Sequence, residues 1–398
     1  MRAGMESAAL KSAGGRPGHP ASLSPSLDVH LVVDRGDFHL DLTLPALRGV
    51  TALLGPNGSG KTTALTAVAG LLRLTSGHVI ASAATPAVWA DASRGLHLPV
   101  DRRSVGMVLA DPLLFPHLTL LDNVAYGPRS RGMTRRAARA RASAELARVG
   151  LAELAGRAPD QVSSGQAQRA ALARALATDP AVLLLDEPLS ALDPQTRSTT
   201  RADLSARLRE YAGVTVIVTH DALDALTLGD HLVFLEGGRA VQSGTPAEVI
   251  ARPRSPYVAG IVGLNLLPGT LLPPQELQTS TSAAPPRVLD LGGGQRLVVA
   301  DLPEGSRPGD AVFATINPEA VTLYTQRPAA SARNLWQLEV GAVTVTGQRA
   351  RVRCAFPGPT KAELVAEVTL RAVAELHIVA GQRLWASVKA TEIHTYPA

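Results

Sequence analysis

The eight residues GPNGSGKT, Gly55 to Thr62, have the composition and spacing of a loop that wraps around phosphate groups. They follow the apolar run VTALL and open the segment TTALTAVAGLL, so the expected context is a strand, a loop and a helix. Glycines let backbone N–H groups turn inward around an anion, and the start of a helix adds positive potential. Lys61 is expected to reach the outer phosphates of a nucleotide, and Thr62 to bind Mg²⁺. The predicted nucleotide site comprises Gly55, Pro56, Asn57, Gly58, Ser59, Gly60, Lys61, Thr62 and Thr63.

Two acidic residues and a histidine follow later apolar runs. AVLLLDEP contains Asp186 and Glu187 at its end, and the next run, IVTHD, leads to His220 at the same expected sheet edge. Asp186 suits the coordination of Mg²⁺, Glu187 can polarise an attacking water molecule, and His220 can contact the terminal phosphate. The alternatives are a solvent-facing strand end and a structural histidine. Because Lys61 is present in the same chain, we predict Glu187 and His220 as catalytic residues.

The elements that would hold these residues alternate along the chain. Residues 28–54 contain short apolar runs typical of strands, and residues 60–72 are predicted to be helical. Residues 113–158, dominated by Ala, Arg and Leu, predict a helical insert. The runs AVLLLDEP, GVTVIVTHD and HLVFLEGG then alternate with helical segments, which is typical of buried parallel strands. The sequence therefore predicts an α/β phosphate-loop domain.

Three further stretches complete a family pattern. VSSGQAQR at 162–169, LLLDEP at 183–188 and SALD at 190–193 occur with the phosphate loop and His220 in the family's order. Over about 28–260, the chain therefore resembles the ATP-binding subunits of ABC transporters. The resemblance implies an ABC ATPase domain at 28–261 that uses ATP and Mg²⁺, with a RecA-like core and a helical subdomain at about 110–165.

The same resemblance implies how the subunit assembles and where it works. Two copies would pair head to tail as a homodimer around two ATP molecules. The dimer would bind membrane permease subunits at the cytoplasmic face of the cell membrane, and an external substrate-binding protein would feed the permease. Asp193 would cross the dimer, and Phe38 is the candidate for stacking on adenine, a core-facing strand residue being the alternative. The residues facing the γ-phosphate held by the other copy would be Ser163, Ser164, Gly165 and Gln166.

The chain departs from the family's pattern at three positions. It has VSSGQ where the family usually has LSGGQ, so Val162 and Ser164 differ, and the Cβ of Ser164 would loosen the approach of backbone to phosphate. In VGMVLADPLLFPHLTLLDNVAYG, Ala110 stands where relatives have a glutamine that touches Mg²⁺, the attacking water and the membrane subunit. Asp111 is a candidate substitute. A weakly active subunit that mainly senses an oxyanion is the alternative.

The remaining residues, 262–398, differ in composition. LLPPQELQTSTSAAPP at 271–286 predicts a loop or hinge, and the short apolar runs beyond it are separated by Gly/Pro turns. This pattern predicts an all-β region of small barrels. The region resembles the oligosaccharide- or anion-binding-like (OB-like) regulatory barrels at the C-terminus of importer ATPases. Residues 330–398 resemble the small molybdate-binding barrel in particular.

A Ser-Ala-Arg-Asn turn and an Ala-Ser-Val-Lys strand carry that last resemblance. Hydroxyl and N–H donors suit a tetrahedral dianion, Lys389 supplies positive charge, and Arg333 supplies more or holds the turn. The alternative is a barrel that only dimerises, since importers of sulfate, iron and polyamines carry related barrels. The chain is most similar to the ATPases of molybdate importers, with molybdate or tungstate as cargo and molybdate as a regulatory ligand. The predicted oxyanion-binding residues are Ser331, Arg333, Asn334, Ser387 and Lys389.

Composition excludes several classes of protein. No run among the 398 residues reaches the 18 apolar residues that a membrane-spanning helix needs. Aromatic residues make up 3% and no nucleic-acid motif is present, so we expect no nucleic acid partner despite the net charge of +5. A single cysteine, Cys354, excludes an internal disulfide and fits a reducing compartment. Residues 1–27 lack the apolar core of a secretion signal and predict a disordered tail that stays in the cytoplasm.

Overall fold

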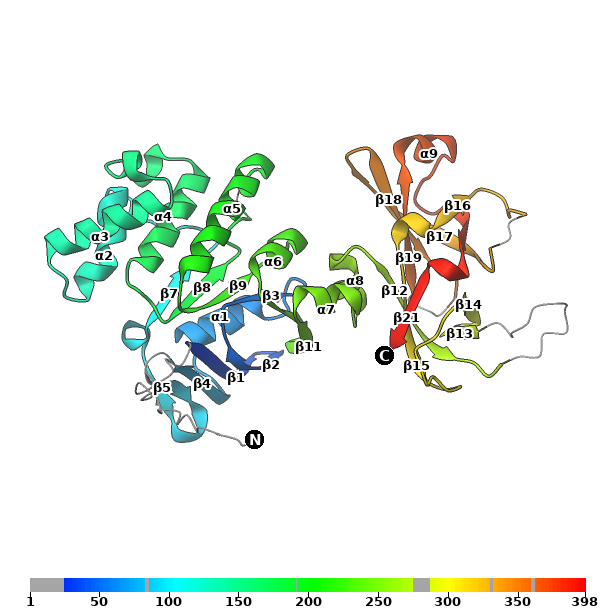
Figure 1. Ribbon diagram of the computed structural model, residues 1–398, viewed down its shortest axis with the longest axis horizontal. Coiled ribbons are helices and arrows are strands. Elements are labelled where there is room, and N and C mark those ends of the chain that lie inside the picture. The colour runs from blue at the N-terminus through cyan, green and yellow to red at the C-terminus, as the bar shows by residue number, and fades with distance from the viewer. Residues whose placement is uncertain (1–24, 83–85, 191, 275–286, 330–331, 359–361) are drawn as a thin grey trace, which may run out of the picture.

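The computed structural model describes residues 25–398, apart from 83–85, 191, 275–286, 330–331 and 359–361. The chain forms two parts, an α/β part up to residue 261 and a β-rich part from residue 265 (Figure 1). Residues 1–24 of the predicted tail lie outside the described residues, and the first strand begins at Ser26, one residue before the predicted end of the tail. Residues 275–286 of the predicted loop also lie outside them.

Eleven strands of the α/β part form one mixed sheet. Their bounds are β1 Ser26–Arg35, β2 Phe38–Leu47, β3 Val50–Leu54, β4 Ser76–Ser82, β5 Pro86–Asp91, β6 Leu96–His97, β7 Val105–Val108, β8 Val182–Asp186, β9 Val214–Val218, β10 His231–Glu236 and β11 Arg239–Gly244. The order across the sheet is β6-β5-β4-β1-β2-β11-β10-β3-β9-β8-β7. From β10 to β7 in this order, adjacent strands run parallel to each other, and from β6 to β2 they run antiparallel. Between these two groups, β11 is parallel to β2 and antiparallel to β10.

The burial of the strands follows their sequences. β1 alternates apolar and polar residues, and its side chains alternate between buried and partly exposed positions. The continuous apolar runs of β3, β8 and β9 are buried at every position, as expected for parallel strands covered on both faces. The three predicted parallel strands are present as β8, β9 and β10. The carboxyl ends of β3, β8 and β9 meet at one edge of the sheet.

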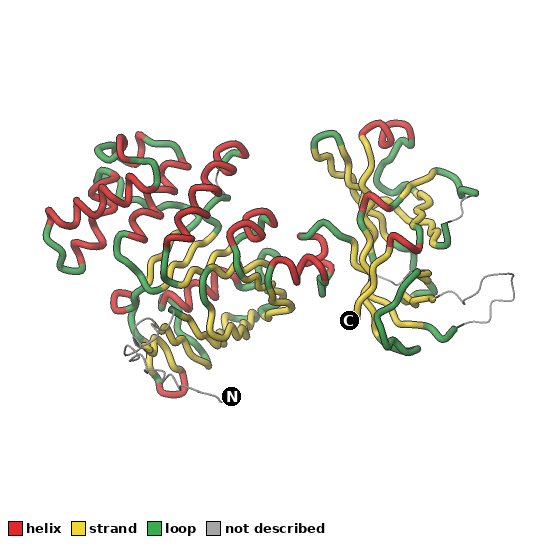
Figure 2. Tube along the Cα trace, in the orientation of Figure 1, coloured by secondary structure: helices red, strands yellow, loops and turns green. Residues whose placement is uncertain are grey.

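Helices cover this sheet on both sides, as Figure 2 shows in red. Their bounds are α1 Lys61–Ala69, α2 Leu120–Ser130, α3 Arg135–Arg148, α4 Ser164–Leu176, α5 Pro194–Glu210, α6 Ala222–Leu228, α7 Pro246–Ala251 and α8 Pro256–Ile261. α2, α3 and α4 share a separate hydrophobic cluster, which includes Leu120, Leu146, Ala170 and Ala173. The helical subdomain was predicted at about 110–165. Its hydrophobic core also includes α4, which ends at Leu176.

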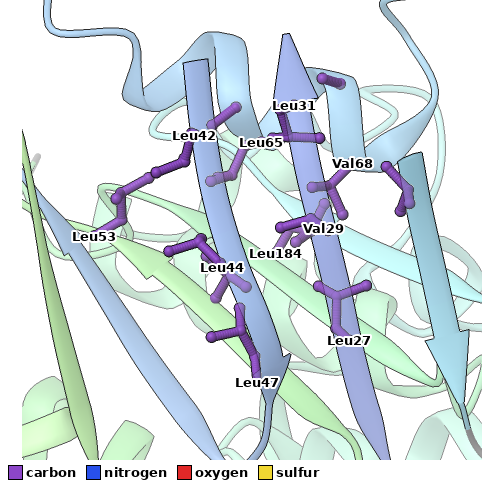
Figure 3. Close-up of a cluster of buried hydrophobic side chains, with 14 of the residues drawn as sticks. Leu27, Val29, Leu31, Leu42, Leu44, Leu47, Leu53, Leu65, Val68 and Leu184 are labelled. Atoms are coloured by element: carbon purple, nitrogen blue, oxygen red, sulfur yellow. The ribbon is translucent and has the colours of Figure 1, made fainter. Parts of the chain in front are cut away.

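The antiparallel strands and the phosphate-loop helix share the largest cluster of the α/β part. In Figure 3, leucine and valine side chains of β1 and β2 project toward Leu65 and Val68 of α1. Leu184 of β8 belongs to the same cluster and is fully buried. This packing fixes α1, and hence the loop before it, between the antiparallel strands and the parallel strands.

The β-rich part contains two five-stranded antiparallel sheets and one short helix, α9 (Leu370–Glu375). Each sheet curls into an open half-barrel (Figure 1). The first sheet has the order β14-β13-β12-β15-β21 and the second β16-β20-β17-β18-β19. The bounds are β12 Asn265–Leu271, β13 Arg287–Gly292, β14 Gln295–Val299, β15 Ala311–Ile316, β16 Thr322–Tyr324, β17 Asn334–Thr346, β18 Arg349–Ala355, β19 Glu363–Thr369, β20 Arg383–Val388 and β21 Ile393–Pro397.

These two sheets exchange strands. β16 follows β15 in the chain but pairs with β20, placing Thr322 opposite Ser387. β21 follows β20 but pairs with β15, placing His394 opposite Thr315. One hydrophobic cluster runs through both sheets. Residues 330–398, predicted as a barrel of their own, therefore share a sheet and a core with residues 265–324.

Contacts also join the two parts of the chain. The Tyr396 hydroxyl donates to the Pro253 carbonyl at 2.6 Å, and Tyr396 clusters with Ala259 and Leu266. The predicted order of fold classes, an α/β phosphate-loop domain followed by an all-β region, is confirmed. Within the described ranges, no helix combines the length and the apolar character needed to cross a membrane.

Candidate nucleotide and anion sites

The phosphate loop connects the end of β3 to the start of α1, as its sequence predicts. Gly60 has a φ of 105°, and a Cβ there would lie 2.8 Å from Cζ of Phe38. A Cβ on Gly55 would lie 2.1 Å from the carbonyl oxygen of Leu235. These positions therefore require glycine, and the loop keeps its backbone exposed to an incoming anion. The half-buried ring of Phe38 lies beside Gly60 and also packs against the hydrophobic core, so its stacking on adenine stays a prediction.

The side chains of the loop leave room for a negatively charged group. Lys61 is 7% exposed, and its Nζ donates to the carbonyls of Gly55 at 2.7 Å and Pro56 at 2.9 Å. Burial lowers the pKa of Lys61, while Glu187 and Asp186 act to raise it. The Ser59 hydroxyl is buried and has no hydrogen-bond partner among the described residues. An unpartnered hydroxyl beside a buried ammonium fits a phosphate ligand.

Thr62 and Asp186 form the pair expected to bind Mg²⁺. The Thr62 hydroxyl donates to Asp186 Oδ2 at 3.2 Å, across from α1 to the end of β8. Burial raises the pKa of Asp186, and the Thr62 hydrogen bond opposes this rise. The described residues hold no group of three or more His, Cys, Asp or Glu side chains suited to a metal. One hydroxyl and one carboxylate fit Mg²⁺, which takes few protein ligands when phosphates supply the rest.

Glu187 and His220 lie side by side at the same edge of the sheet. Oε1 of Glu187 is 3.2 Å from Nδ1 of His220, although the two residues follow different strands. Glu187 has a φ of 47°, which is strained for a residue with a side chain. Its N–H donates to the Val218 carbonyl at 2.9 Å, which holds the strained turn in place. Both side chains remain partly exposed, so an attacking water molecule can reach them.

The stretch VSSGQ begins helix α4. The Ser163 hydroxyl accepts the Gln166 N–H at 3.3 Å, and Gln166 Oε1 accepts the Ser163 N–H at 2.9 Å. The Gln166 side chain thus caps its own helix. Gly165 is buried, and a Cβ there would lie 2.9 Å from Thr196 Cγ2, whereas Ser163 and Ser164 are exposed. The start of α4 is therefore open to solvent, with the positive potential of a helix N-terminus.

Asp193 caps the next long helix, α5. Its Oδ1 accepts the N–H groups of Gln195 at 3.2 Å and Thr196 at 3.1 Å. Hydrogen bonds from Thr196 lower the pKa of Asp193. The exposed carboxylate therefore both starts α5 and faces solvent.

Ala110 lies just beyond β7, next to β8 in the sheet, and is exposed. Oδ1 of Asp111 accepts the Leu113 N–H at 3.3 Å, so this carboxylate shapes its own loop. The guanidinium of Arg174 donates to the carbonyls of Pro112 at 2.9 Å and Leu113 at 2.8 Å. Sequence reasoning missed Arg174, although its place on the helix after VSSGQ brings it beside this loop.

The β-rich part contains a cavity of about 460 Å³ between its exchanged strands. Of the predicted oxyanion-binding residues, Ser387 and Lys389 line it, Ser387 being buried and Lys389 exposed. The remaining lining residues come largely from the turn after β15 and from β16, and sequence reasoning missed them. They are Asn317, Glu319, Ala320, Thr322, Tyr324, Ala332 and Glu392.

Two predicted oxyanion-binding residues, Arg333 and Asn334, are not among those that line this cavity. Both amide atoms of Asn334 bond to the backbone of Val298, at 2.7 and 2.8 Å, so this buried side chain joins the two sheets. Arg333 is exposed and lies outside the lining set. Ser331 falls outside the described residues.

Comparisons with known proteins agree with this architecture. A family model described as ABC transporter matches residues 39–190, and one described as TOBE domain matches residues 330–395. The chain is 40% identical over 367 residues to the molybdenum import ATP-binding protein ModC of Mycobacterium tuberculosis, covering 91% of this chain and 95% of the relative. It is 33% identical over 347 residues to the sn-glycerol-3-phosphate import ATP-binding protein UgpC of Ralstonia nicotianae, covering 86% and 88%.

Other similar proteins match less of the chain. The spermidine/putrescine import ATP-binding protein PotA of Frankia alni is 40% identical over 281 residues, covering 70% of this chain and 58% of the relative. The solved structure of cbiO1 from Clostridium perfringens, described as part of the ABC transporter complex cbiONQ, matches with a TM-score of 0.50 and 28% identity. That match covers 57% of this chain and 92% of cbiO1.

Proposed function

The chain belongs to the ATP-binding subunits of ABC transporters, and from this premise we propose that it hydrolyses ATP to drive molybdate uptake through a membrane permease. Its relatives are importer ATPases, so this chain is an importer ATPase as well. The family uses ATP and Mg²⁺. The cargo, the residues that carry the reaction and the assembly described below are our proposal.

The observation that carries the proposed hydrolysis is the meeting of four side chains at one sheet edge. They are Lys61, Asp186, Glu187 and His220. Lys61 would hold the outer phosphates, Glu187 would polarise water and accept its proton, and His220 would orient the terminal phosphate. When Mg²⁺ is bound, Thr62 and Asp186 would hold it, and its charge would offset that of the phosphates.

A second copy of the chain would complete each nucleotide site. The exposed start of α4, with Ser163 and the backbone of Gly165, offers N–H groups and helix potential to an anion. Such a site is suited to the far side of a γ-phosphate that another copy holds. Asp193, exposed at the start of α5, would reach across the same interface.

An apolar surface next to Ala110 supports docking of a permease at the cytoplasmic face of the membrane. Leu113 is 56% exposed and Tyr126 is 52% exposed, and the ring of Phe115 lies 4.7 Å from that of Tyr126. Exposed apolar side chains gathered on one surface are typical of protein interfaces. A cytoplasmic loop of the permease would cover this surface, and an external substrate-binding protein would deliver the anion.

Two observations favour molybdate as the cargo. The relative named for molybdenum import matches along nearly its whole length, including the β-rich part. The cavity lined by Ser387 and Lys389 offers a hydroxyl and a positive charge to a tetrahedral dianion. Two carboxylates, Glu319 and Glu392, line it too, and an ion pair with Arg349 compensates the charge of Glu319. Sulfate, iron and polyamine are the alternative cargoes, because relatives of comparable identity import other substrates.

The second candidate function, a subunit that mainly senses an oxyanion, is favoured by one observation, Ala110 in place of a glutamine. If the missing glutamine slows hydrolysis, the chain would act mainly as an oxyanion-sensing subunit that gates the complex. The β-rich cavity would then be its main ligand site, with molybdate as a regulatory ligand.

The discriminating experiment is ATP hydrolysis by the chain in complex with its permease and binding protein. Molybdate, tungstate, sulfate, ferric ion and spermidine are each supplied through the binding protein. We expect molybdate to stimulate hydrolysis most strongly. Equal stimulation by sulfate would contradict the proposed cargo. Hydrolysis that no cargo changes, with molybdate bound to the chain, would favour the sensing function.

A further inference from the structure

A cluster of arginines and aspartates ties helix α5 to helix α6. Nη2 of Arg197 lies 2.7 Å from Oδ2 of Asp224 and 3.3 Å from Oδ2 of Asp221. Nε of Arg201 lies 2.5 Å from Oδ1 of Asp224. The Asp224 side chain is 3% exposed, and a carboxylate this deeply buried is costly unless it is paired. The cluster therefore fixes the two helices against each other.

Arg197 is linked at short range to both segments that carry predicted site residues. Its backbone N–H donates to the carbonyl of Asp193, the N-cap residue of α5, at 2.8 Å. Its side chain contacts Asp221, which begins α6 by accepting the Asp224 N–H at 2.9 Å. Asp221 directly follows His220 in the chain. One residue thus contacts the segment of Asp193 and the segment of His220.

Glu187 has one contact with each of these two segments. On one side, the Ser190 hydroxyl donates to the Glu187 carbonyl at 2.9 Å, at the start of the segment that leads to Asp193. On the other side, His220 Nδ1 lies 3.2 Å from Glu187 Oε1. Arg197 is where the two sides meet. The printed contacts are Ser190 to Glu187, Arg197 to Asp193, Arg197 to Asp221 and His220 to Glu187.

We propose that Arg197 is a positioning residue, which fixes His220 and Asp193 relative to each other. A displacement of His220 at the terminal phosphate is then passed to the segment that meets the second copy of the chain. The inference rests on the proposed ATPase function and adds to it a coupling between the two nucleotide sites. A guanidinium suits this role because it is planar and always charged, and its Nη2 contacts both carboxylates, which a flexible ammonium does less well.

Arg201 provides a matched control. It is bound to the same buried Asp224, but it lies 3.9 Å from Asp221 and one helical turn farther from Asp193. Arg197→Gln and Arg201→Gln each leave Asp224 with one arginine, so the two variants should lose similar stability. Any difference in catalysis between them therefore reports positioning rather than folding.

The test compares ATP hydrolysis by the full chain and its variants. We expect Arg197→Gln to lower kcat about tenfold, because misplaced catalytic groups lose effective concentration. KM for ATP should stay within about twofold, since Arg197 lies outside the phosphate loop. Arg201→Gln should keep kcat within about twofold while its Tm falls as far as that of Arg197→Gln. Arg197→Lys, which keeps the positive charge but not the planar guanidinium, should recover part of the kcat that Arg197→Gln loses.

A double-mutant cycle identifies the residue through which Arg197 acts. If Arg197 acts through Asp193, adding Arg197→Gln to Asp193→Asn should lower kcat by less than about twofold further. Equal kcat values of Arg197→Gln and Arg201→Gln, or losses of kcat that multiply in the double mutant, would overturn the positioning role of Arg197. They would leave the proposed ATPase function standing. An unsubstituted chain that hydrolyses no ATP would overturn the proposed function and this inference together.

Discussion

The two candidate sites of this chain are assembled in different ways. The nucleotide site is built from segments that each end a parallel strand or begin a helix, so neighbouring residues in the sequence act together. The cavity of the β-rich part is built where two sheets exchange strands, and Thr322 faces Ser387 from 65 positions away in the sequence. The residues of a site made of contiguous motifs can be predicted from one sequence, whereas those of a site made by strand exchange cannot.

The two sites also differ in how firmly their charged residues are held. Lys61 is buried, bonded to two carbonyls and influenced by two carboxylates, whereas Lys389 is exposed. A buried lysine held by backbone is pre-organised for one ligand geometry. An exposed lysine must be ordered when its ligand binds, so its contribution to affinity is smaller. We therefore expect larger effects from substitutions at the nucleotide site.

The largest expected effect is loss of hydrolysis in Glu187→Gln. Without a carboxylate to accept the proton of water, kcat should fall about 100-fold or more, while ATP still binds. Phosphate release and nucleotide binding are measured on the same preparation, with the exposed Glu210→Gln as the control. Unchanged hydrolysis would show that another group activates the water.

Lys61→Ala is expected to weaken ATP binding. Loss of a buried ammonium that meets phosphate should raise Kd about 30-fold, equivalent to about 2 kcal/mol. Equilibrium binding of a fluorescent ATP analogue measures this, and Lys389→Ala is the control because it replaces the same residue type in the β-rich part. If Lys61→Ala raised the Kd for ATP less than Lys389→Ala does, the expected difference between the two sites would be contradicted.

The substitutions of Lys389 and Lys61 also test the oxyanion site, with molybdate as the ligand. Lys389→Ala should weaken molybdate binding to the full chain about tenfold, the effect of losing one charged hydrogen bond. Titration calorimetry with molybdate and with sulfate measures it. Lys61→Ala should leave molybdate affinity unchanged. If neither anion releases or absorbs heat with the unsubstituted chain, the cavity is structural.

The smallest expected effect is a gain. Ala110→Gln should raise kcat about threefold, because one added polar contact contributes about 0.5–1 kcal/mol. Asp111→Asn is the matched variant, and it should leave kcat unchanged because this carboxylate bonds to the Leu113 N–H. Steady-state hydrolysis measures both. A large loss in Asp111→Asn would instead show that Asp111 takes over the role of the missing glutamine.

Sequence alone predicted which side chains meet at the nucleotide site. Thr62 lies beside Asp186 and Glu187 beside His220 because each motif ends a strand of one parallel sheet. Their roles in catalysis stay predictions. The contacts of Arg197 with Asp221 and Asp224 were not predicted, because periodicity places an arginine on a helix without showing which residues pack against it.

In the β-rich part, sequence predicted strands and two of the residues that line the cavity. It assigned Asn334 to the anion because the Ser-Ala-Arg-Asn turn resembles that of a molybdate-binding barrel, yet its amide bonds to Val298. Asn265 bonds to Val365 in the same way, at 2.6 and 2.9 Å. Both asparagines precede a leucine at the start of a strand, and this repeated pair is the signal that could have revealed their shared structural role.

The most direct test of the account is a structure of Glu187→Gln determined with ATP and Mg²⁺. We predict two chains closed on each other, with each triphosphate between Lys61 of one chain and Ser163 of the other. Thr62 and Asp186 should lie next to the metal. Triphosphate bound far from Lys61, or a single chain that binds ATP without pairing, would contradict it.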